Sequence, residues 1–235
     1  VIMNIHNGEI VALASSPDFN ANKERGEFGK NKDSSIYFNR VVQGVYEMGS
    51  TFKVFSVAQG LEKDLFTLDS LIDTRAFRIN SRKIEDKYKF NSESSIYEII
   101  VRSSNVGSAR LALMVGEKGL KEIFSKLGLL EPVRLELREA NTTRPILPKN
   151  WHDITLATVS YGYGMSVSLL HLAKAYAIIG NGGFNIEPTI LKKNHSSQPG
   201  SRVLKKTTSD EMLKLLEAVV TDQRGTARIL RSKYY

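Results

Sequence analysis

The hydrophobic pattern of the chain opens with two short apolar runs, over residues 1–5 and 9–14, which Asn7 and Gly8 separate. An Asn-Gly pair between two such runs is typical of a tight β-hairpin, because both turn residues must take positive φ. We therefore predict two antiparallel strands at the start of the chain. The polar and irregular residues 18–40 then predict a surface loop.

Apolar residues recur at helical spacing along most of the remaining chain. After Gly49 the pattern predicts a helix whose buried face carries residues such as Val54 and Leu61. Ser95 with Glu98, and Thr208 with Glu211, have the spacing of capping boxes, which begin helices. Further helices are predicted over residues 95–102, 106–116, 118–127, 151–161, 168–180 and 208–219.

This order of elements, in which strands precede a helical block, favours an α+β fold. The helical block is expected to be a large insertion between strands of one antiparallel sheet. Residues 1–45 and 184–235 would form an α/β lobe, and residues 46–183 a mostly helical lobe. Because two strands alone are marginally stable, we expect them to pair with segments after residue 184 or beyond this chain.

Composition narrows the possible functions. The 235 residues are 41% hydrophobic and 25% charged, which suits one sizeable core. The absence of cysteine excludes disulfides and thiolate metal sites, and the four histidines lack the spacing of metal ligands. The net charge of +8 comes from basic residues interleaved with acids, which is unlike a nucleic-acid-binding pattern and predicts a solvated surface.

One long stretch without formal charge, residues 154–173, has the length of a membrane span. Its many glycine, serine and threonine residues make it too polar for a transmembrane helix. Any membrane anchor is therefore expected outside this chain.

The first candidate catalytic residues are Ser50 and Lys53, which form the only Ser-x-x-Lys in the chain. Residues three apart share one helix face, so the hydroxyl and the amine can meet. A lysine of lowered pKa can take the proton that makes serine a nucleophile, and a helix N-terminus favours the developing negative charge. About one such match is expected by chance in a chain of this length, so the pair taken alone more often marks an ordinary helix start than an active site.

A second motif, Ser103-Ser104-Asn105, is the only Ser-x-Asn and falls between two predicted helices. Serine and asparagine are common in helix-capping loops, which gives the motif a purely structural interpretation. The functional interpretation is a second hydroxyl for proton relay and an amide that binds a substrate peptide group. The two motifs in this order match the Ser-x-x-Lys and Ser-x-Asn pair of penicillin-recognising enzymes.

The chain as a whole resembles the transpeptidase domain of class B penicillin-binding proteins, and it looks most like the division or septal branch. Tyr163 favours that branch, because glutamine is usual there in the elongation branch. Met48 stands where the family usually has proline. The resemblance runs through residues 1–17, 46–53, 102–113 and 160–164 together with the helix that follows.

The family's third motif, Lys-Thr-Gly, is absent from the chain, since Lys206-Thr207-Thr208 lacks the glycine. In the family this motif lies on a strand that walls one side of the cleft. We therefore expect an incomplete transpeptidase domain that stops before the motif. Its cleft would be open on one side, and this piece by itself would react weakly or not at all with penicillin.

The resemblance implies a role for each candidate residue. Ser50 would attack a D-Ala-D-Ala stem peptide and form an acyl-enzyme, Lys53 would accept its proton, and Ser103 would relay a proton to the leaving group. Asn105 would hold the amide of the acyl donor. Tyr161 and Tyr163 would line the cleft, although a place in the core is as plausible.

The resemblance also implies partners and location. No metal or cofactor is expected. The partners would be peptidoglycan stem peptides, β-lactam antibiotics that trap the serine, and membrane proteins of the division complex. The protein would act at the periplasmic, extracytoplasmic face of the bacterial inner membrane.

Other functions remain open at this point. A serine β-lactamase, a D,D-carboxypeptidase or a β-lactam sensor could share the fold. A lactamase needs a base for deacylation, and the loop over residues 131–150 offers Glu131, Glu136 and Glu139 without a convincing candidate. A relative without catalytic activity could instead bind only peptidoglycan or division partners.

Overall fold

The structure, a computed structural model, describes residues 1–18, 22, 36–192 and 200–232. Its helices are α1 (Lys53–Glu62), α2 (Ile96–Val101), α3 (Asn105–Lys126), α4 (Asp153–Ser160), α5 (Leu169–Gly180) and α6 (Lys206–Thr221). Short 3₁₀ turns are η2 (Gly49–Phe52), η3 (Ala140–Thr142) and η4 (Arg228–Leu230). The strands are β1 (Ile2–Met3), β2 (Ile10–Ala12), β3 (Leu71–Asp73), β4 (Phe77–Ile79), β5 (Arg82–Ile84) and β6 (Glu93–Ser95).

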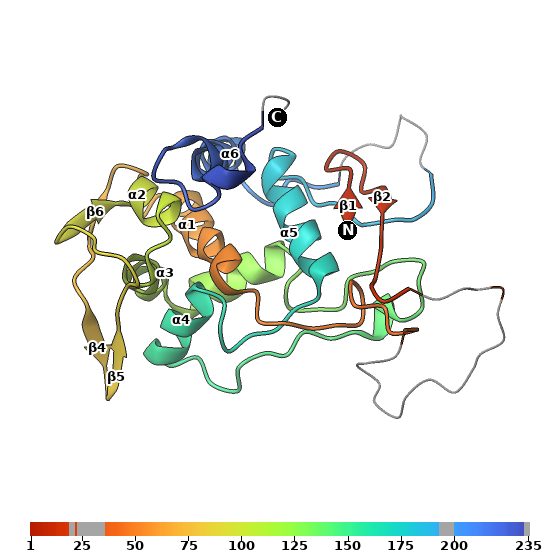
Figure 1. Cartoon of the computed structure of the whole chain (residues 1–235), viewed down its shortest axis with the longest axis horizontal. Coiled ribbons are helices and arrows are strands. Elements are labelled where there is room, and N and C mark those ends of the chain that lie inside the picture. The colour runs from red at the N-terminus through yellow and green to blue at the C-terminus, as the bar shows by residue number, and fades with distance from the viewer. Residues whose placement is uncertain (19–21, 23–35, 193–199, 233–235) are drawn as a thin grey trace.

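The described strands form three antiparallel pairs, β1–β2, β3–β6 and β4–β5. Figure 1 shows β1 and β2 next to α5 at one end of the molecule and the β4–β5 hairpin at the other end, with the helices between them. Most of the predicted loop over residues 18–40 lies outside the described residues.

The predicted opening hairpin is confirmed, but its turn differs from the expected one. Gly8 has a φ of 79°, whereas Asn7 is not among the described residues with positive φ. The turn is wider than two residues, because Asn4 exchanges backbone hydrogen bonds with Gly8 and Glu9. Thr189 forms a parallel bridge with Glu9, so a segment after residue 184 joins the hairpin as predicted.

The centre of the fold is α1, which is buried from Lys53 through Leu61 and packs against α3 and α6. Phe52, Phe55 and Phe124 meet in this core with ring centroids 5.0–6.2 Å apart. Burying an aromatic or aliphatic side chain contributes ~1.5–3 kcal/mol, so this packing fixes where α1 begins. The start of α1 is therefore packed into the core of the fold.

Most predicted helix boundaries are confirmed. Ser95 caps α2 by accepting from the Glu98 backbone N–H at 3.2 Å. Gly116, where one predicted helix ends and the next begins, has φ 72° and ψ 172° and kinks α3. The uncharged residues 154–173 contain α4, a glycine turn and the start of α5, and no described helix is long and apolar enough to cross a membrane.

The capping box predicted at Thr208 and Glu211 is wrong. The helix begins earlier, at Lys206, and Lys205 occupies the cap position without a side-chain cap. The Thr208 hydroxyl instead donates to the Glu62 carboxylate at 2.9 Å. This contact joins α6 to the end of α1. Because the two residues are far apart in sequence, a local sequence pattern cannot predict it.

The buried His171 forms the cap of α5 together with Ser168. Its Nε2 lies 3.0 Å from the Glu131 carbonyl oxygen, which can only accept, so Nε2 carries the proton. Nδ1 therefore accepts from the Ser168 hydroxyl at 2.6 Å. Burial lowers the pKa of His171 to about 4, which keeps the ring neutral at pH 7.

Because the pKa of His171 is lowered in the folded chain, we predict that the fold loses stability in mild acid. Between its ordinary pKa of 6.5 and the folded value of about 4, the unfolded chain binds a proton that the folded chain does not. The free energy of unfolding should fall by roughly 2 kcal/mol between pH 7 and pH 5 on this account. Chemical denaturation at both pH values measures the loss, and His171→Gln should shrink it. An equal loss in the variant would contradict the assignment.

Candidate active site

Ser50 lies on an exposed turn at the head of the buried helix α1. Gly49 has a φ of 55°, which a glycine adopts without strain, and turns the chain into η2. Ser50 follows in this 3₁₀ turn, and α1 begins at Lys53. The helix start predicted from the sequence is therefore present, with the serine accessible and the lysine inside.

Lys53 is 2% exposed and binds the Ser-x-Asn loop directly. Its Nζ donates to the Ser103 hydroxyl and to the Ser103 carbonyl oxygen, both at 2.7 Å. Desolvation lowers the pKa of Lys53 to about 8, although the nearby Asp86 carboxylate opposes the shift. At pH 7 roughly a tenth of the amine is neutral, so Lys53 can act as a base.

The Ser-x-Asn motif lies in the connector between α2 and α3, as predicted. Ser103 adopts a left-handed backbone with a φ of 62°, an uncommon conformation for serine. Ser104 caps α3 by accepting from the Gly107 backbone N–H at 2.9 Å, and Asn105 is the first residue of α3. The capping interpretation and the functional one thus both apply, to neighbouring residues.

One cavity of about 310 Å³ brings the two motifs together. Ser50, Lys53, Ser103 and Asn105 all line it. The remaining lining residues are Asp86, Lys87, Tyr88, Phe90, Arg102 and Thr226. Four of the six residues proposed from the sequence therefore share one site.

The two tyrosines proposed for the cleft do not line this cavity. Tyr161 is half-buried and packs on a small apolar cluster, and Tyr163 is 54% exposed, with its ring centroid 6.0 Å from that of Tyr161. Gly162 between them has the closer relation to the site. Its carbonyl oxygen accepts from the Gly49 N–H at 3.1 Å, and a Cβ at Gly162 would overlap the Gly49 backbone.

Asp86 is the site residue that the sequence did not reveal. It follows β5, and its carboxylate accepts hydrogen bonds from Ser104 Oγ at 2.6 Å and from the backbone N–H groups of Asn105 and Val106 at 2.5 and 3.2 Å. These contacts place a negative charge at the N-terminus of α3, where the helix dipole favours it. The only signal in the sequence was one aspartate in a weakly patterned segment.

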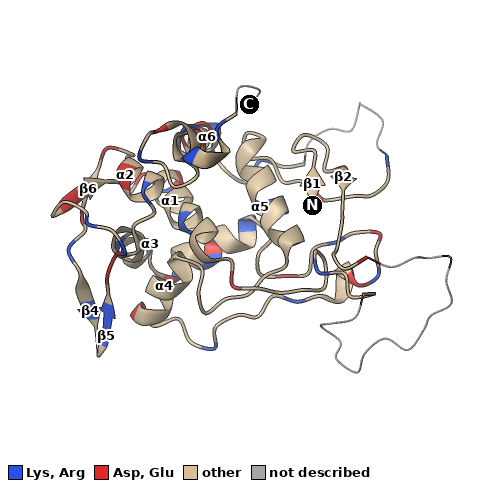
Figure 2. Ribbon diagram, in the orientation of Figure 1, with Lys and Arg blue, Asp and Glu red and all other residues tan. Residues whose placement is uncertain are grey.

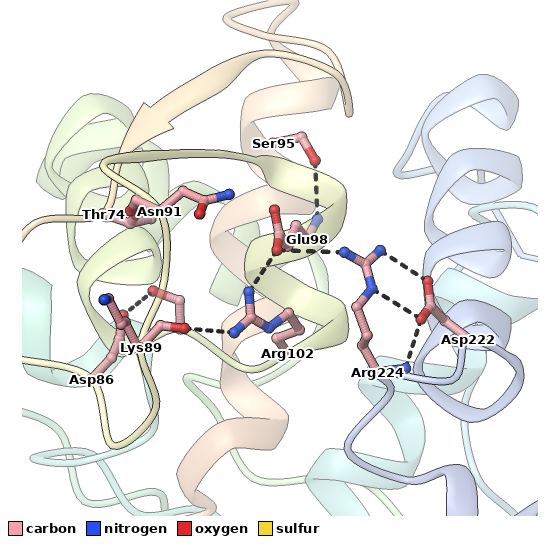
Figure 3. Close-up of polar contacts among 10 residues, drawn as sticks. Thr74, Asp86, Lys89, Asn91, Ser95, Glu98, Arg102, Asp222 and Arg224 are labelled. Carbon is pink, nitrogen blue, oxygen red and sulfur yellow. Dashed lines mark hydrogen bonds and ion pairs between the residues drawn. The ribbon is translucent and has the colours of Figure 1, made fainter.

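A network of ion pairs and hydrogen bonds supports the part of the cavity wall that residues 87–90 form (Figure 3). Arg102 donates to Glu98 at 2.6 Å and to the Lys89 carbonyl oxygen at 2.7 Å, and its guanidinium stacks 4.1 Å from the centroid of the Phe90 ring. Arg224, after α6, reaches the same Glu98 at 3.5 Å. The wall formed by residues 87–90 is thereby tied to α2 and to the segment after α6.

The charged residues that line the cavity are mostly basic. Lys53, Lys87 and Arg102 face it against the single carboxylate of Asp86. Figure 2 shows further basic residues on the β4–β5 hairpin, which precedes Asp86 in the chain and carries Arg78, Arg82 and Lys83. The surroundings of Ser50 therefore favour a substrate or intermediate that carries negative charge.

Comparison with known proteins agrees with the transpeptidase resemblance along the whole chain. The family model for the penicillin binding protein transpeptidase domain matches residues 1–235. The chain is 40% identical over 227 residues to the protein named probable peptidoglycan D,D-transpeptidase FtsI from Caulobacter vibrioides. It is 32% identical over 225 residues to peptidoglycan D,D-transpeptidase FtsI from Escherichia coli K12. Each match covers 96% of this chain and 37% of the relative.

Solved structures share the fold. The transpeptidase domain of penicillin-binding protein 3 from Burkholderia pseudomallei superposes with a TM-score of 0.78 at 33% identity, over 84% of this chain and 60% of that one. A crystal structure described as a peptidoglycan glycosyltransferase from Burkholderia ambifaria gives a TM-score of 0.85 at 29% identity, over 99% of this chain and 68% of the other. These likenesses confirm the predicted fold class.

Proposed function

Because the chain belongs to the penicillin-binding protein transpeptidase family, we propose that it carries the acylating site of a septal peptidoglycan D,D-transpeptidase. The observation that supports this most directly is the hydrogen bonding of buried Lys53 to Ser103 in the cavity that Ser50 lines. The substrate would be a stem peptide that ends in D-Ala-D-Ala. The chain spans 37% of the length of these curated relatives, so activity, substrate and partners are proposals for the intact protein.

The acylation half of the reaction uses residues of this cavity. Ser50 Oγ attacks the carbonyl carbon of the penultimate D-alanine while its proton passes to neutral Lys53. Two N–H groups of that amine donate to Ser103, which leaves the nitrogen lone pair to take the proton. The oxyanion that forms is stabilised by a backbone N–H at Ser50.

Collapse of this intermediate breaks the peptide bond to the terminal D-alanine. The proton on Lys53 passes through the Ser103 hydroxyl to the departing amine, and an ester on Ser50 remains. The amine of a neighbouring stem peptide then attacks the ester, and its proton returns through the same pair. The products are a cross-linked peptide and free Ser50. Asn105 would hold the amide of the acyl donor during both halves.

A β-lactamase is the alternative that the structure disfavours. Hydrolysis of the acyl-enzyme needs a base that activates water close to the ester. Glu131, Glu136 and Glu139 are not among the described residues that line the cavity. The carboxylate that does line it, Asp86, already accepts hydrogen bonds from Ser104, Asn105 and Val106. Glu136 instead binds the backbone N–H of Ile190 at 3.0 Å. The acyl group is therefore expected to persist on Ser50.

We further propose, from the likeness to the FtsI relatives, that the protein works with division-complex membrane proteins at the extracytoplasmic face of the inner membrane. β-Lactams would inhibit it by acylating Ser50.

A fluorescent penicillin tests the proposed function on the intact protein. We expect the wild type to become covalently labelled and to keep the label after free penicillin is removed, because none of the three glutamates proposed as a deacylation base lines the cavity. Ser50→Ala serves as the blank and should not be labelled. Absence of label on the wild type would indicate a binding module, and rapid loss of label with release of hydrolysed drug would indicate a lactamase.

A further inference from the structure

Positive charge is concentrated in one short stretch of this chain, residues 75–89. Six basic and two acidic side chains in it give +4, which is half of the chain's net charge of +8. The stretch forms the β4–β5 hairpin, whose basic residues are blue in Figure 2, and then continues into residues that line the cavity of Ser50. A few residues of chain therefore join this basic surface to the candidate active site.

One face of the hairpin is packed and the other faces solvent. Phe77, Ile79 and Ile84 lie on a small apolar cluster that also includes residues of α3 and α4. Because side chains alternate across a strand, Arg78 and Lys83 project from the opposite face, where both are exposed. The register places these two residues directly opposite each other. The hairpin thus presents a guanidinium beside an ammonium on a packed backbone.

The two charges are poorly compensated within the chain. Like charges that lie directly opposite each other destabilise an antiparallel pair of strands. Lys83 forms an ion pair with Glu85, an exposed contact of the kind that contributes little. Arg78 donates to the Ser81 carbonyl oxygen at 2.7 Å and has no carboxylate partner among the described residues. A second carboxylate between the two cations would offset their repulsion.

The hairpin lies within reach of a peptide that occupies the cavity. Lys87 lines the cavity and follows Lys83 by four residues, so their Cα atoms are at most ~14 Å apart. An extended peptide advances ~3.3 Å per residue, so about five residues cover this distance. Lys87 and Arg102 in the cavity wall carry the same sign of charge as the hairpin. Basic residues thus accompany the chain from the hairpin to the cavity.

We propose that Arg78 and Lys83 form a docking site for a carboxylate of the donor peptide, outside the cavity in which the peptide is cleaved. The planar guanidinium of Arg78 can bind a carboxylate through two parallel hydrogen bonds, and Lys83 adds a second positive charge. The proposal rests on the proposed function, because the docked peptide is the one that acylates Ser50. It gives the enzyme a preference for donors with an acidic residue within about five residues of the scissile bond.

Peptide binding to the intact protein tests this site. The probes are pentapeptides that end in D-Ala-D-Ala, carry glutamate at the first, second or third position and bear a neutral fluorophore, each with a glutamine counterpart. Ser50→Ala prevents acylation, so fluorescence polarisation measures binding alone. At least one glutamate peptide should bind about three- to tenfold more tightly than its glutamine counterpart, and salt should reduce the difference. Equal binding within every pair would overturn the proposal.

Three substitutions, each added to Ser50→Ala, locate the site on the hairpin. Arg78→Gln and Lys83→Gln should each remove most of the preference for glutamate. Both should keep or raise the melting temperature, because each removes one of two opposed like charges, whereas loss of a purely structural residue would lower it. Glu85→Gln should strengthen binding of the glutamate peptide, since it frees Lys83. A preference that survives in both Arg78→Gln and Lys83→Gln would contradict the site.

Arg82→Gln is the matched control. It removes the same charge from the other face of the same hairpin, where Arg82 lines a separate cavity with residues of α4, and it should keep the preference. A loss equal to that in Arg78→Gln would show attraction by net charge alone and overturn the site. Phosphatidylcholine vesicles with and without phosphatidylglycerol test an anionic membrane as the ligand. If Arg78→Gln weakens vesicle binding but leaves the peptide preference intact, the proposal is wrong.

Failure of this proposal is distinct from failure of the proposed function. If the wild type reacts with penicillin and peptide binding is independent of the glutamate charge, the docking site is refuted and the transpeptidase function stands. If the wild type does not react, the proposed function fails, and fluorescence polarisation still decides whether the hairpin binds carboxylates. If Arg78→Gln does not fold, Lys83→Gln and the paired peptides decide in the same way.

Discussion

Replacing Lys53 by alanine is expected to slow penicillin acylation of Ser50 by ~10²–10⁴-fold, the usual cost of losing a general base. The substitution removes the amine proposed to take the serine proton, and with it both hydrogen bonds to Ser103. Pre-steady-state labelling with a fluorescent penicillin measures the rate. Because no other described lysine has its amine on Ser103, no neighbour should rescue the reaction.

Lys174 provides the matched control for this loss. It is 7% exposed and pairs with Glu187 at 2.7 Å, so it is buried like Lys53 but lies away from the cavity. Lys174→Ala should lower thermal stability and leave the acylation rate of the folded protein unchanged. An acylation rate in Lys53→Ala equal to that of Lys174→Ala would contradict the role of Lys53.

The second large effect is expected at Gly162, whose backbone carbonyl oxygen accepts from the Gly49 N–H in the turn that carries Ser50. Gly162 has a φ of 86°, and an added Cβ would overlap the Gly49 nitrogen and carbonyl oxygen. Gly162→Ala should therefore lower the free energy of unfolding by ~1–2 kcal/mol through left-handed backbone strain, and by a further ~1–3 kcal/mol through the clash. Relief of the clash would move the turn that carries Ser50, so acylation should slow as well, by up to ~10²-fold.

Gly164 separates strain from clash in this prediction. Its φ of 83° is almost the same, but an added Cβ would meet nothing closer than Thr158 Oγ1 at 3.6 Å. Gly164→Ala should therefore lower the free energy of unfolding only by the cost of the backbone strain, and it should leave the acylation rate unchanged. Urea unfolding and labelling rates of both variants provide the comparison. Equal losses in the two variants would mean that the contact between Gly162 and Gly49 does not position Ser50.

The parts of the site predicted from sequence are those with a local signal. Gly49 ahead of an apolar stripe predicts the start of a helix, and this places Ser50 and Lys53 at its head. Ser103-Ser104-Asn105 between two helical patterns predicts a connector, and Ser104 indeed caps α3. In each case the information lies within one or two helical turns of the residue concerned.

Contacts between distant segments explain what the sequence did not reveal. Asp86 lies 18–20 residues before the groups that it binds, in a segment without clear periodicity. The left-handed conformation of Ser103, with its φ of 62°, has no signature in the local sequence either. Thr208 looks like a cap locally, but a carboxylate of α1 occupies its hydroxyl.

The aromatic residues show the limit of inference by resemblance. Tyr161 and Tyr163 were expected to line the cleft, yet Gly162 between them makes the contact with the turn that carries Ser50. In the Tyr-Gly-Tyr pattern the two rings suggest a binding role. The structure instead requires a glycine at position 162, because a Cβ there would overlap the Gly49 backbone. A part for either ring in substrate binding remains a prediction.

The central claim is that Ser50 is the nucleophile, and peptide mapping after acylation tests it most directly. Trypsin cleaves after Arg40 and Lys53, which isolates residues 41–53 as one peptide whose hydroxyl groups belong to Tyr46, Ser50 and Thr51. After the intact protein reacts with a penicillin, this peptide should carry the mass of the opened drug, and fragment ions should place it on Ser50. An adduct on Thr51, on Ser103 or on any other peptide would contradict the account.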